Sequence, residues 1–419
     1  MARRARSRWG ALALRNAALV ALAQLACTRG TAPNTRPLPP AAVDARLTRV
    51  SLGVMPTATL SATSRWQLVD RAGVVVSRGD SGARTVASVA GDVIRIGDAR
   101  GGDAPLTLSS TGGIVSLNGR RYRGELVFSR ADSGLLVVNR VDVEAYLRGV
   151  VPREMGIRGP AERAALEAQA VAARSYAVIR LHNTSRAYDL VATTSDQVYG
   201  GVDSENALAD AAVAATESLV LMYDGRIVNA PYSSTCGGST AAPSEVWRSR
   251  DEPFLQRVSD RIPGSDRFYC DIGPRFRWER SWRGDTLTAI VERYIRSYAQ
   301  VPAGPVGVVR GISVEGRTPS GRVAAISLET DRGRYRLQGN DIRYVLRSSG
   351  GELLNSTYFS PENVAGSDGR LSRLTIRGLG YGHGIGMCQW GAIGRARAGQ
   401  DFRTILRTYF PGTNVARAY

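Results

Sequence analysis

The stretch of sequence that decides the fold runs from Val150 to Tyr176 and reads VVPREMGIRGPAERAALEAQAVAARSY. Proline is favoured in the first turn of a helix, and Pro160 stands at the start of an alanine-rich segment. Small residues then recur at helical spacing from Ala165, and the pattern continues to about His182. Because small side chains let neighbouring backbones approach closely, we expect a central, buried helix here.

The residues before this helix have the pattern of β-strands. Between residues 45 and 140, short runs rich in β-branched residues alternate with Gly, Asp and Ser turns. The runs are VSLGV, WQLVD, GVVVSRG, DVIRIG, LTLSS, ELVFS and GLLVVNRV. We therefore expect a β-rich amino-terminal part over residues 45–140.

The residues after this helix mix helical and strand patterns. Helical patterns lie at Glu205–Glu217, Thr286–Ala299 and near Phe402–Tyr409, and the first is followed by the strand-like runs SLVLMY and RIVNAPYSS. Val308–Leu337 is strand-rich, with a hairpin turn at Asp331–Gly333. The expected fold class is α+β, mixed and β-rich, with a second region over residues 141–415.

The first 27 residues have the three parts of an export signal. Four arginines within the first eight residues precede an apolar run from Ala17 to Ala26, which is too short to span a bilayer as a helix. Leu25-Ala26-Cys27 resembles the end of a lipoprotein signal, although Gln24 stands where Leu is usual. Cys27 is thus a candidate lipid-attachment site, and ordinary cleavage nearby or an uncleaved anchor are the alternatives.

The expected location follows from this signal and from the segment behind it. Residues 28–44 are rich in Pro and Thr and are expected to form a tether rather than a fold. We expect an exported protein of the periplasm or cell envelope. Contact with the membrane would be made only through the amino terminus, as in an anchored lipoprotein.

The charge of the chain indicates the kind of partner. All of the 55 basic residues are Arg, and the formal net charge of +18 suggests polyanionic partners such as cell-wall polymers, lipid head groups or nucleic acid. Arg is interleaved with Asp and Glu, and no zinc-finger, basic-zipper or recognition-helix pattern occurs. We expect no nucleic-acid partner.

Two later segments carry unusual motifs. Tyr232–Thr240 reads YSSTCGGST, and Gly380–Ala392 reads GYGHGIGMCQWGA; their glycines allow the backbone to approach another surface closely. Taken alone, each signal is weak, because a lone His is more often structural and Glu154 has the local sequence of a surface carboxylate. Together with the segment VPREM that contains Glu154, however, they resemble the SpoIID/LytB family of bacterial cell-wall proteins.

The resemblance rests on four motifs. The family patterns are V-P-x-E-M, A-Q-A-V-A-A-R-x-Y-A, S-x-C-G-G-x-T and G-x-G-H-G-x-G-M-x-Q-x-G-A, and the chain matches them closely. It departs at Gly156, where the family usually has Pro, and at Cys388, where Ser is common. The resemblance implies a β-rich SpoIID-like fold and a SpoIID/LytB-like catalytic region over residues 141–415.

The resemblance also implies a reaction. Cleavage of a glycosidic bond requires a proton on the leaving oxygen, and an ordinary glycosidase adds a second carboxylate. A lytic transglycosylase needs only one, because the C6 hydroxyl of the sugar attacks the anomeric carbon and leaves a 1,6-anhydro end. The family implies that Glu154 is this acid and base, acting on peptide-stripped peptidoglycan glycan strands. Pairing with Arg153 or Arg158 would lower its pKa and defeat the acid role.

The resemblance makes further residues candidates for substrate binding. These are Gln169, Arg174, Tyr176, Ser233, Ser234, His383 and Gln389. Gln169 and Tyr176 share one helix face, whereas Arg174 could instead pair with a carboxylate. We expect His383 to line the glycan cleft opposite Glu154, and Trp247, Tyr269 and Trp390 could stack on sugar rings or pack in the core.

The cysteines leave two readings open. In an oxidising compartment Cys236 and Cys270 favour a disulfide, which would leave Cys388 as a buried thiol. Some members of the family are associated with zinc near this segment, but a structural zinc needs four ligands and no CxxC or HxxxH spacing occurs. We therefore expect the disulfide and no cofactor or metal, with zinc as the less favoured alternative.

Two functions other than catalysis remain open. Members of the LytB kind are described as stimulating a cell-wall amidase, so a non-catalytic amidase enhancer is the main rival. A glycan-binding protein without turnover would keep the aromatic residues and lose only the acid. Retention of Glu154 and of the complete His383 segment favours the enzyme.

Overall fold

The computed structural model describes residues 46–100, 104–181 and 185–419. The predicted signal, the tether and the candidate lipid-attachment site Cys27 lie outside the described residues. None of the helices in the described part of the chain combines the length and the apolar character that a membrane span requires. The mixture of helices and strands confirms the predicted α+β, β-rich fold class.

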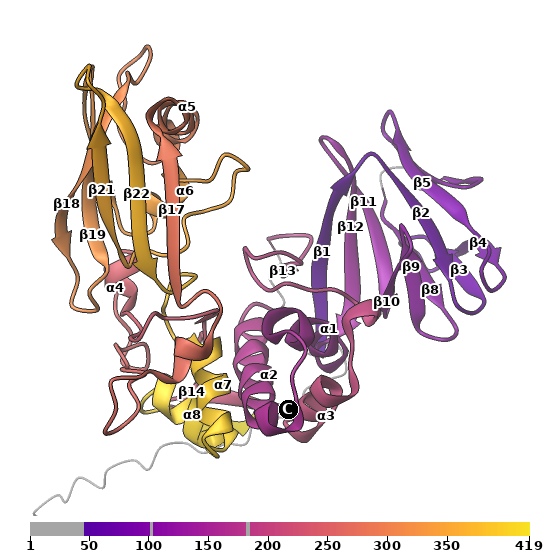
Figure 1. The fold of residues 1–419 in the computed structure, drawn as a ribbon. Helices are drawn as coiled ribbons and strands as arrows, with labels where there is room; N and C mark the ends of the chain where they lie inside the picture. Colours follow the sequence, from indigo (N-terminus) through magenta and orange to yellow (C-terminus); the bar gives the residue numbers. More distant parts are fainter. Residues whose placement is uncertain (1–45, 101–103, 182–184) are drawn as a thin grey trace, which may run out of the picture. The chain divides into compact units, whose positions relative to one another are not determined.

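The amino-terminal part consists of two sheets (Figure 1, indigo to purple). The larger has the strand order β13-β1-β12-β11-β8-β3-β4, and the smaller has the order β10-β9-β2-β5-β6-β7. All seven predicted runs form strands, and the structure adds β2, β5, β7, β9, β10 and β13. The bounds are β1 Leu47–Met55, β2 Thr57–Ala62, β3 Trp66–Val69, β4 Val75–Gly79, β5 Thr85–Ala90, β6 Val93–Ile96, β7 Ala99–Arg100, β8 Leu106–Ser110, β9 Ile114–Leu117, β10 Arg120–Arg123, β11 Glu125–Ala131, β12 Gly134–Asp142 and β13 Leu190–Val191.

The two sheets bury apolar side chains between them because their strands alternate in burial. In β2, for example, Ala58, Leu60 and Ala62 are buried while the intervening positions are wholly or partly exposed. Strands β11 and β12 of the larger sheet contact β6 and β5 of the smaller one. The resulting core continues into the helices that follow, so one core runs across the predicted division at residue 140.

Strand β12 leads directly into helix α1 (Val143–Met155), which the sequence analysis did not predict. The carboxylate of Asp142 caps it by accepting the backbone N–H of Glu144 at 2.9 Å. The helix contains Pro152 and ends at Gly156, whose φ of 72° is in the left-handed region that favours glycine. Glu154 therefore lies in the last turn of a helix and not in a loop.

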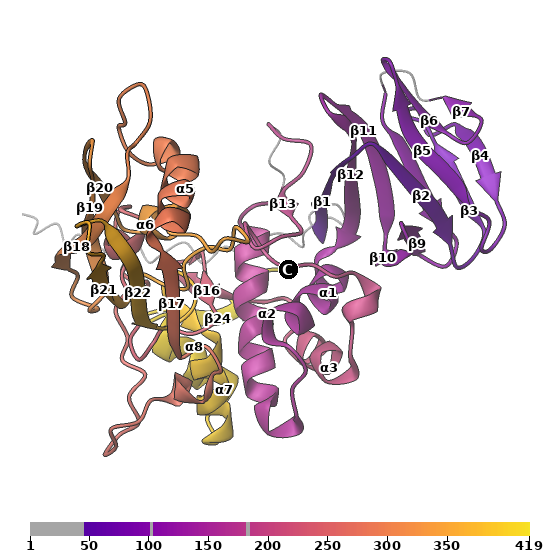
Figure 2. The ribbon, with the colours of Figure 1, turned by 45° about the horizontal axis from the view of Figure 1, so that its top comes forward.

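Helix α2 (Arg163–Val178) is the predicted central helix. It follows a single 3-10 turn, η2 (Pro160–Glu162), and ends before the predicted limit near residue 182. Its alanines from Ala165 onward are fully buried, and it contacts α1, α3 (Ala207–Ala215), α7 (Gln389–Arg397) and α8 (Phe402–Tyr409). Figure 2 shows α2 beside α1 and α3. The prediction of a central, buried helix is confirmed.

A second core lies among residues 282–376, within two three-stranded sheets. The predicted hairpin is confirmed, since β19 and β20 pair antiparallel with Thr330 opposite Gly333. Helix α5 covers most of the predicted segment Thr286–Ala299 and is followed by η5. The bounds are β17 Arg277–Arg283, α5 Gly284–Tyr294, η5 Ile295–Ser297, β18 Val309–Arg317, β19 Val323–Thr330, β20 Gly333–Gln338, α6 Asp341–Val345, β21 Phe359–Ala365 and β22 Leu371–Leu379.

Short strands bring the two glycine-rich motifs together. Strand β16 (Tyr232–Ser233) pairs in parallel with β23 (Met387–Cys388), and β23 leads directly into α7. The remaining elements are η3 Val202–Ser204, β14 Leu219–Tyr223, β15 Arg226–Ile227, α4 Pro243–Val246, η4 Tyr269–Ile272 and β24 Asn414–Arg417. This pairing places the start of α7 next to the segment that contains Cys236, and α7 also contacts α2.

Candidate active site

The carboxylate of Glu154 lies in a poorly solvated position without a cationic partner. One oxygen accepts the backbone N–H of Val198 at 2.7 Å, and the other accepts the side-chain amide of Gln389 at 3.3 Å. Desolvation raises the pKa of Glu154, against the opposing effects of these two hydrogen bonds and of the charge on Arg153. No ion pair to Glu154 occurs within residues 46–100, 104–181 and 185–419.

Neither of the two arginines that could have defeated an acid role forms an ion pair with Glu154 in the described part of the chain. Arg158 donates from Nε to the carbonyl oxygen of Met155, and its guanidinium lies 4.8 Å from the ring centre of Trp390. Arg153 makes neither a hydrogen bond nor an ion pair with Glu154 in the part of the chain that the structure describes. Glu154 therefore has no ion pair that would defeat an acid role, and desolvation favours its protonated form.

Gln389 and Gln169 are brought to Glu154 by α7 and α2. The amide nitrogen of Gln389 is shared between Glu154 and the side-chain oxygen of Gln169, each at 3.3 Å. Gln169 is fully buried, and its Nε2 has no hydrogen-bond partner among the described residues. The structure thus brings three of the predicted site residues together and leaves one buried amide donor beside the carboxylate.

A second polar group near Glu154 was missed by the sequence analysis. The side chain of Gln197 accepts the hydroxyl of Tyr146 at 3.1 Å and donates to the hydroxyl oxygen of Tyr232 at 2.8 Å. Burial is the main cause of a raised pKa for both tyrosines, and the charge of Glu154 adds to it. Gln197 immediately precedes Val198, so one loop both hydrogen-bonds Glu154 and orients the two phenols. No motif indicated this loop, because its residues become neighbours of Glu154 only in the fold.

Tyr176 belongs to the same surroundings through Asp196. Its hydroxyl donates to one oxygen of Asp196 at 2.7 Å, and the other oxygen accepts the backbone N–H of Val191 at 2.9 Å. The guanidinium of Arg180 lies 3.4 Å from the centre of the Tyr176 ring and donates to the side chain of Asn229. Both oxygens of Asp196 are therefore engaged in holding the loop.

His383 is held by backbone groups in one tautomer. Its Nε2–H donates to the carbonyl oxygen of Tyr232 at 2.9 Å, while Nδ1 accepts the N–H of Ile385 at 3.1 Å. Burial, with a smaller effect of Arg343, lowers the pKa of His383 to about 3, so the ring is neutral at ordinary pH. Its ring packs on Trp247 with a centroid distance of 4.9 Å. His383 is linked to the Glu154 surroundings through Tyr232.

Two of the three serines of the first motif, Ser233 and Ser234, were predicted to bind substrate, and they differ in their contacts. Ser233 is buried, and its hydroxyl accepts the backbone N–H of Gly384 at 3.1 Å. Ser234 is partly exposed, its backbone carbonyl accepts the N–H of Trp390 at 3.0 Å, and its hydroxyl has no hydrogen-bond partner among the described residues. Gly384 itself is required by close contact, because its φ is 76° and a Cβ there would lie 2.0 Å from the guanidinium of Arg322. Ser233 therefore fixes the motif, whereas Ser234 is the serine with an available hydroxyl.

Arg174 is the predicted site residue that the structure places elsewhere. Its guanidinium is fully buried and makes two hydrogen bonds to Glu144, at 2.7 and 2.6 Å, and a third to the carbonyl oxygen of Leu219. The hydroxyl of Tyr419 and the N–H of Ser218 also bind the Glu144 carboxylate. The sequence allowed Arg174 either to bind substrate or to pair with a carboxylate, and in the structure it pairs with the carboxylate of Glu144.

The three cysteines that the structure describes form one buried cluster with an aspartate. The sulfurs of Cys236 and Cys270 are 3.7 Å apart and are not bonded, and Cys388 and Asp260 lie beside them. Sequence spacing could not indicate this cluster, because its members come from three separate segments, around Cys236, Asp260–Cys270 and Cys388. The disulfide remains a prediction, and the cluster offers the chemistry of a metal site.

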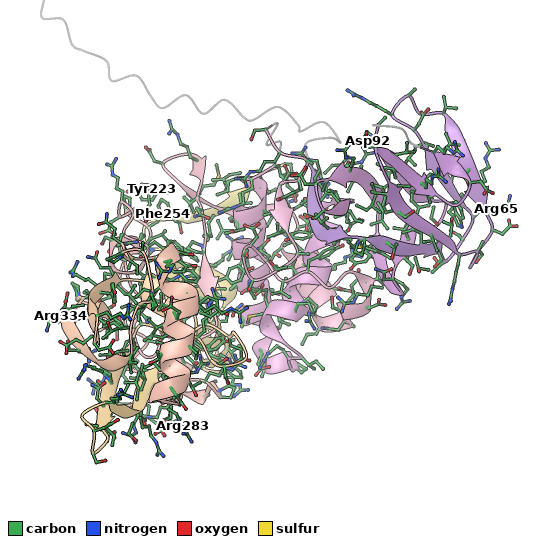
Figure 3. The ribbon with its side chains drawn as sticks, turned by 90° about the horizontal axis from the view of Figure 1, so that it is seen from above. Arg65, Asp92, Tyr223, Phe254, Arg283 and Arg334 are labelled. Atoms are coloured by element: carbon green, nitrogen blue, oxygen red, sulfur yellow. The ribbon has the colours of Figure 1, made fainter. Side chains whose placement is uncertain are left out.

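A hollow of about 680 Å³ lies close to Trp247. Its lining includes Asn229, Trp247 and the neighbouring rings of Tyr223 and Phe254, whose centroids are 5.6 Å apart (Figure 3). Asn229 is the partner of Arg180, and Trp247 is the partner of His383. The hollow is therefore bordered by Trp247, which contacts His383, and by Asn229, which contacts the Arg180 that lies against Tyr176.

Comparison with known proteins identifies the family. An uncharacterised protein of Brachyspira hyodysenteriae is 32% identical over 302 residues, which cover 72% of this chain and 73% of that protein. The amidase enhancer of Bacillus subtilis is 32% identical over 332 residues, or 73% of this chain and 45% of its own length. The chain belongs to the SpoIID/LytB family.

Further matches fit this family. The stage II sporulation protein D of Bacillus subtilis is 28% identical over 298 residues, which cover 67% of this chain and 76% of that protein. The SpoIID family, described as stage II sporulation protein, matches residues 131–223, and a domain of unknown function, DUF8618, matches residues 267–386. The SpoIID match includes Glu154, α2 and the Gln197 loop. Membership in SpoIID/LytB indicates a cell-wall-related role.

Proposed function

We propose that this protein is a lytic transglycosylase that cleaves peptide-stripped peptidoglycan glycan strands and leaves 1,6-anhydro ends. The observation that supports this most directly is the environment of Glu154. Glu154 is partly buried and has no cationic partner, and desolvation raises its pKa, which favours the protonated form that a general acid must carry.

In the proposed reaction Glu154 serves twice. It first donates its proton to the glycosidic oxygen as the bond to the anomeric carbon breaks. The carboxylate then accepts the proton of the C6 hydroxyl as that oxygen attacks the same carbon, and the acid is regenerated. The hydrogen bonds from Val198 and Gln389 would hold the carboxyl group in place and stabilise its charged form between the two steps.

Among residues 46–100, 104–181 and 185–419, no second carboxylate is a cause of the pKa shift of Glu154, and this supports the use of one acid. Asp196 is the nearby candidate, since it contributes to the electrostatic environment of Tyr146 together with Glu154. Both of its oxygens are occupied, by Tyr176 and by the N–H of Val191. In a hydrolysis with two carboxylates, an oxygen of Asp196 would have to activate water or attack the sugar.

The proposed substrate contacts are the polar groups left available around Glu154. Gln389 and Gln169 present amides beside the carboxyl group, and Ser234 presents a hydroxyl on the segment paired with β23. Trp247 has 38% of its surface exposed and borders the hollow, so it offers a face for a sugar ring. Ser233 and His383 would act by fixing the backbone that carries these groups.

A second candidate function is amidase enhancement without turnover. It is favoured by the similarity to the protein named amidase enhancer, of which this chain matches less than half. In that case a cell-wall amidase would be the partner, and the Glu154 surroundings would bind glycan without cleaving it.

The two functions are separated by analysing products from peptide-free glycan strands by mass spectrometry. We expect the purified wild-type protein to produce 1,6-anhydro ends, and Glu154→Gln to lose at least about a hundredfold in rate while still binding glycan. Glu167→Gln is the matched control, because Glu167 lies on α2 in a surface pair with Arg163 and should keep full activity. Absence of anhydro products from the wild type, with stimulation of an added amidase by wild type and Glu154→Gln alike, would establish the enhancer instead.

A further inference from the structure

The buried thiol cluster, defined as Cys236, Asp260, Cys270 and Cys388, carries an inference that is independent of the proposed activity. One ligand atom from each residue lies within 4.8 Å of all the others, and all four residues are buried. We propose that the thiol cluster is a structural zinc site with three thiolate ligands and one carboxylate ligand.

The distances fit a shared metal ion better than a disulfide. With Zn–S bonds of about 2.3 Å, two thiolates of a tetrahedral site lie about 3.8 Å apart. The sulfurs of Cys236 and Cys270 are 3.7 Å apart. A disulfide would instead place two sulfurs about 2.05 Å apart. A thiolate sulfur and a carboxylate oxygen on one zinc are separated by about 3.6 Å. The sulfur of Cys236 lies 3.4 Å from Oδ2 of Asp260.

Hydrogen bonds around the cluster suit metal-bound thiolates and a carboxylate. The sulfur of Cys388 accepts two backbone N–H groups, from Cys236 at 3.2 Å and from Gly391 at 3.3 Å. In Asp260, Oδ1 accepts the hydroxyl of Tyr409 and the guanidinium of Arg395, whereas Oδ2 faces Cys236. Such outer hydrogen bonds orient metal ligands, and here they leave one oxygen of Asp260 directed at the sulfurs.

The charges around the cluster also favour an ion. Three thiolates, one carboxylate and a divalent cation carry a net charge of −2, and two buried guanidinium groups lie next to them. Arg395 pairs with Asp260 at 3.0 Å, and Arg322 donates to the carbonyl oxygen of Cys236 at 2.8 Å. Arg322 is fully buried, and its Nε and Nη1 have no hydrogen-bond partner among the described residues. The charge of Glu245 already acts on this guanidinium, and metal-bound thiolates would add negative charge beside it that neutral thiols do not supply.

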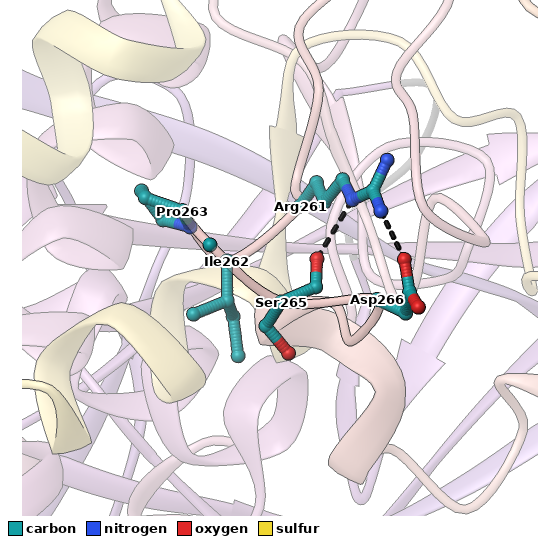
Figure 4. A pocket seen from close by; sticks show the side chains of 6 residues that line it. Arg261, Ile262, Pro263, Ser265 and Asp266 are labelled. Atoms are coloured by element: carbon teal, nitrogen blue, oxygen red, sulfur yellow. Dashed lines mark hydrogen bonds and ion pairs between the residues drawn. The ribbon is translucent and has the colours of Figure 1, made fainter.

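The fold supplies the four ligands from three segments, which explains the absence of a short spacing motif. Asp260 and Cys270 stand at the two ends of one hairpin, where Tyr269 N–H donates to the Asp260 carbonyl oxygen at 2.8 Å. Figure 4 shows the tip of this hairpin, closed by bonds from Arg261 to Ser265 and Asp266. Cys236 and Cys388 come from the paired β16 and β23 segments. All four ligands are protein groups, as in a closed structural site.

The zinc would also support the candidate active site, and this consequence alone rests on the proposed function. Cys388 caps α7 and immediately precedes Gln389, which hydrogen-bonds Glu154. An ion that joins Cys388 to Cys236 would fix the start of α7 against the first motif.

The direct test is the metal content of the full chain, purified without chelators under conditions that protect thiols. We expect about one zinc per chain by elemental mass spectrometry, released when a mercurial reagent titrates the thiols. Replacement by Co²⁺ should produce the absorption of a tetrahedral thiolate site. Three unpaired thiols should be found at Cys236, Cys270 and Cys388. These measurements use the wild-type chain, so they do not depend on the folding of a variant.

Variants then assign the ligands. Cys388→Ser and Asp260→Asn should each lower zinc occupancy and alter the Co²⁺ spectrum, whereas Glu154→Gln should keep full occupancy while losing activity. A Cys236–Cys270 disulfide with no stoichiometric metal would overturn the proposal, as would iron in place of zinc. Full zinc with unchanged Co²⁺ spectra in both ligand variants would overturn it equally. Failure of the transglycosylase assay would leave the metal result unaffected.

Discussion

The side-chain amide of Gln389 lies 3.3 Å from the carboxylate of Glu154, although the two residues are 235 positions apart in the chain. The contact joins the last turn of α1 to the first residue of α7. It also connects the two motifs that are most characteristic of the sequence. Substitutions at this site are therefore expected to change both the catalytic rate and the stability of the fold.

The Glu154→Gln variant should be more stable than the wild type at high pH. Burial raises the pKa of Glu154 in the folded chain above its value in the unfolded chain. The free energy of unfolding therefore decreases as pH rises from the unfolded pKa through the folded pKa, because the unfolded chain ionises more easily. A neutral amide removes this penalty. Thermal unfolding should show a higher Tm for Glu154→Gln at pH 8 and no gain near pH 4. Glu167→Gln is the control, and an equal shift at both pH values would contradict the explanation.

Arg174→Ala should destabilise the fold rather than weaken glycan binding. It would leave the buried carboxylate of Glu144 without its guanidinium partner, and breaking a buried pair costs about 3–5 kcal/mol. Denaturant unfolding should show this loss, while Arg163→Ala, which removes an exposed pair with Glu167, should change stability by less than about 1 kcal/mol. A stable Arg174→Ala protein with selectively weakened glycan binding would restore Arg174 to the cleft.

His383 should remain neutral across the working pH range. In the folded chain the pKa of His383 is about 3, so near pH 6 only the unfolded chain takes up this proton. Protonation therefore favours the unfolded chain, and the stability of the fold decreases as pH falls below the ordinary pKa of histidine. NMR of labelled imidazole rings should show no titration of His383 between pH 5 and 8. A His182→Gln sample assigns the signal, and a midpoint near 6.5 would refute the desolvated, backbone-bound state of His383.

Gly391→Ala should disturb the thiol cluster. A Cβ at this position would lie 2.1 Å from both a carboxylate oxygen of Asp260 and the hydroxyl of Tyr409, so both groups, or the helix itself, must move. Overpacking of this kind typically costs about 1–3 kcal/mol. Gly159→Ala is a matched control, because nothing lies within 4 Å of its added Cβ. Equal Tm values for the two variants would show that the site can relax.

Cys27→Ser should release the protein from membranes. The arginine-led apolar run ending at Leu25-Ala26-Cys27 predicts a lipid-modified amino terminus, and two acyl chains suffice for stable anchoring. Cell fractionation should place the wild type with membranes, while Cys27→Ser should lose acylation and the processing that depends on it. An unmodified mature amino terminus downstream of Cys27 in the wild type would exclude the lipoprotein prediction.

Much of the fold could be predicted because its patterns are local. The alternation of apolar residues marks the amino-terminal strands, and the alanine spacing after Pro160 marks α2. Helix α1 could not be predicted in the same way, since Pro152 stands inside it and Gly149 lowers its helical propensity. Its helical form depends on burial of Val143, Tyr146, Leu147 and Val150 in the main core.

The sequence by itself determined the fold class, the central helix and the family, and it singled out Glu154, Gln169, His383 and Gln389. Only the tertiary structure decided which of these residues meet. It joined Gln389 and Gln169 to Glu154, placed Arg174 against Glu144, and brought Asp260 to three cysteines. The physical reason is that residue type and spacing report on one helix or strand at a time. Burial, pKa and ligand geometry arise between segments, where the packing of α1, α2 and α7 sets the distances.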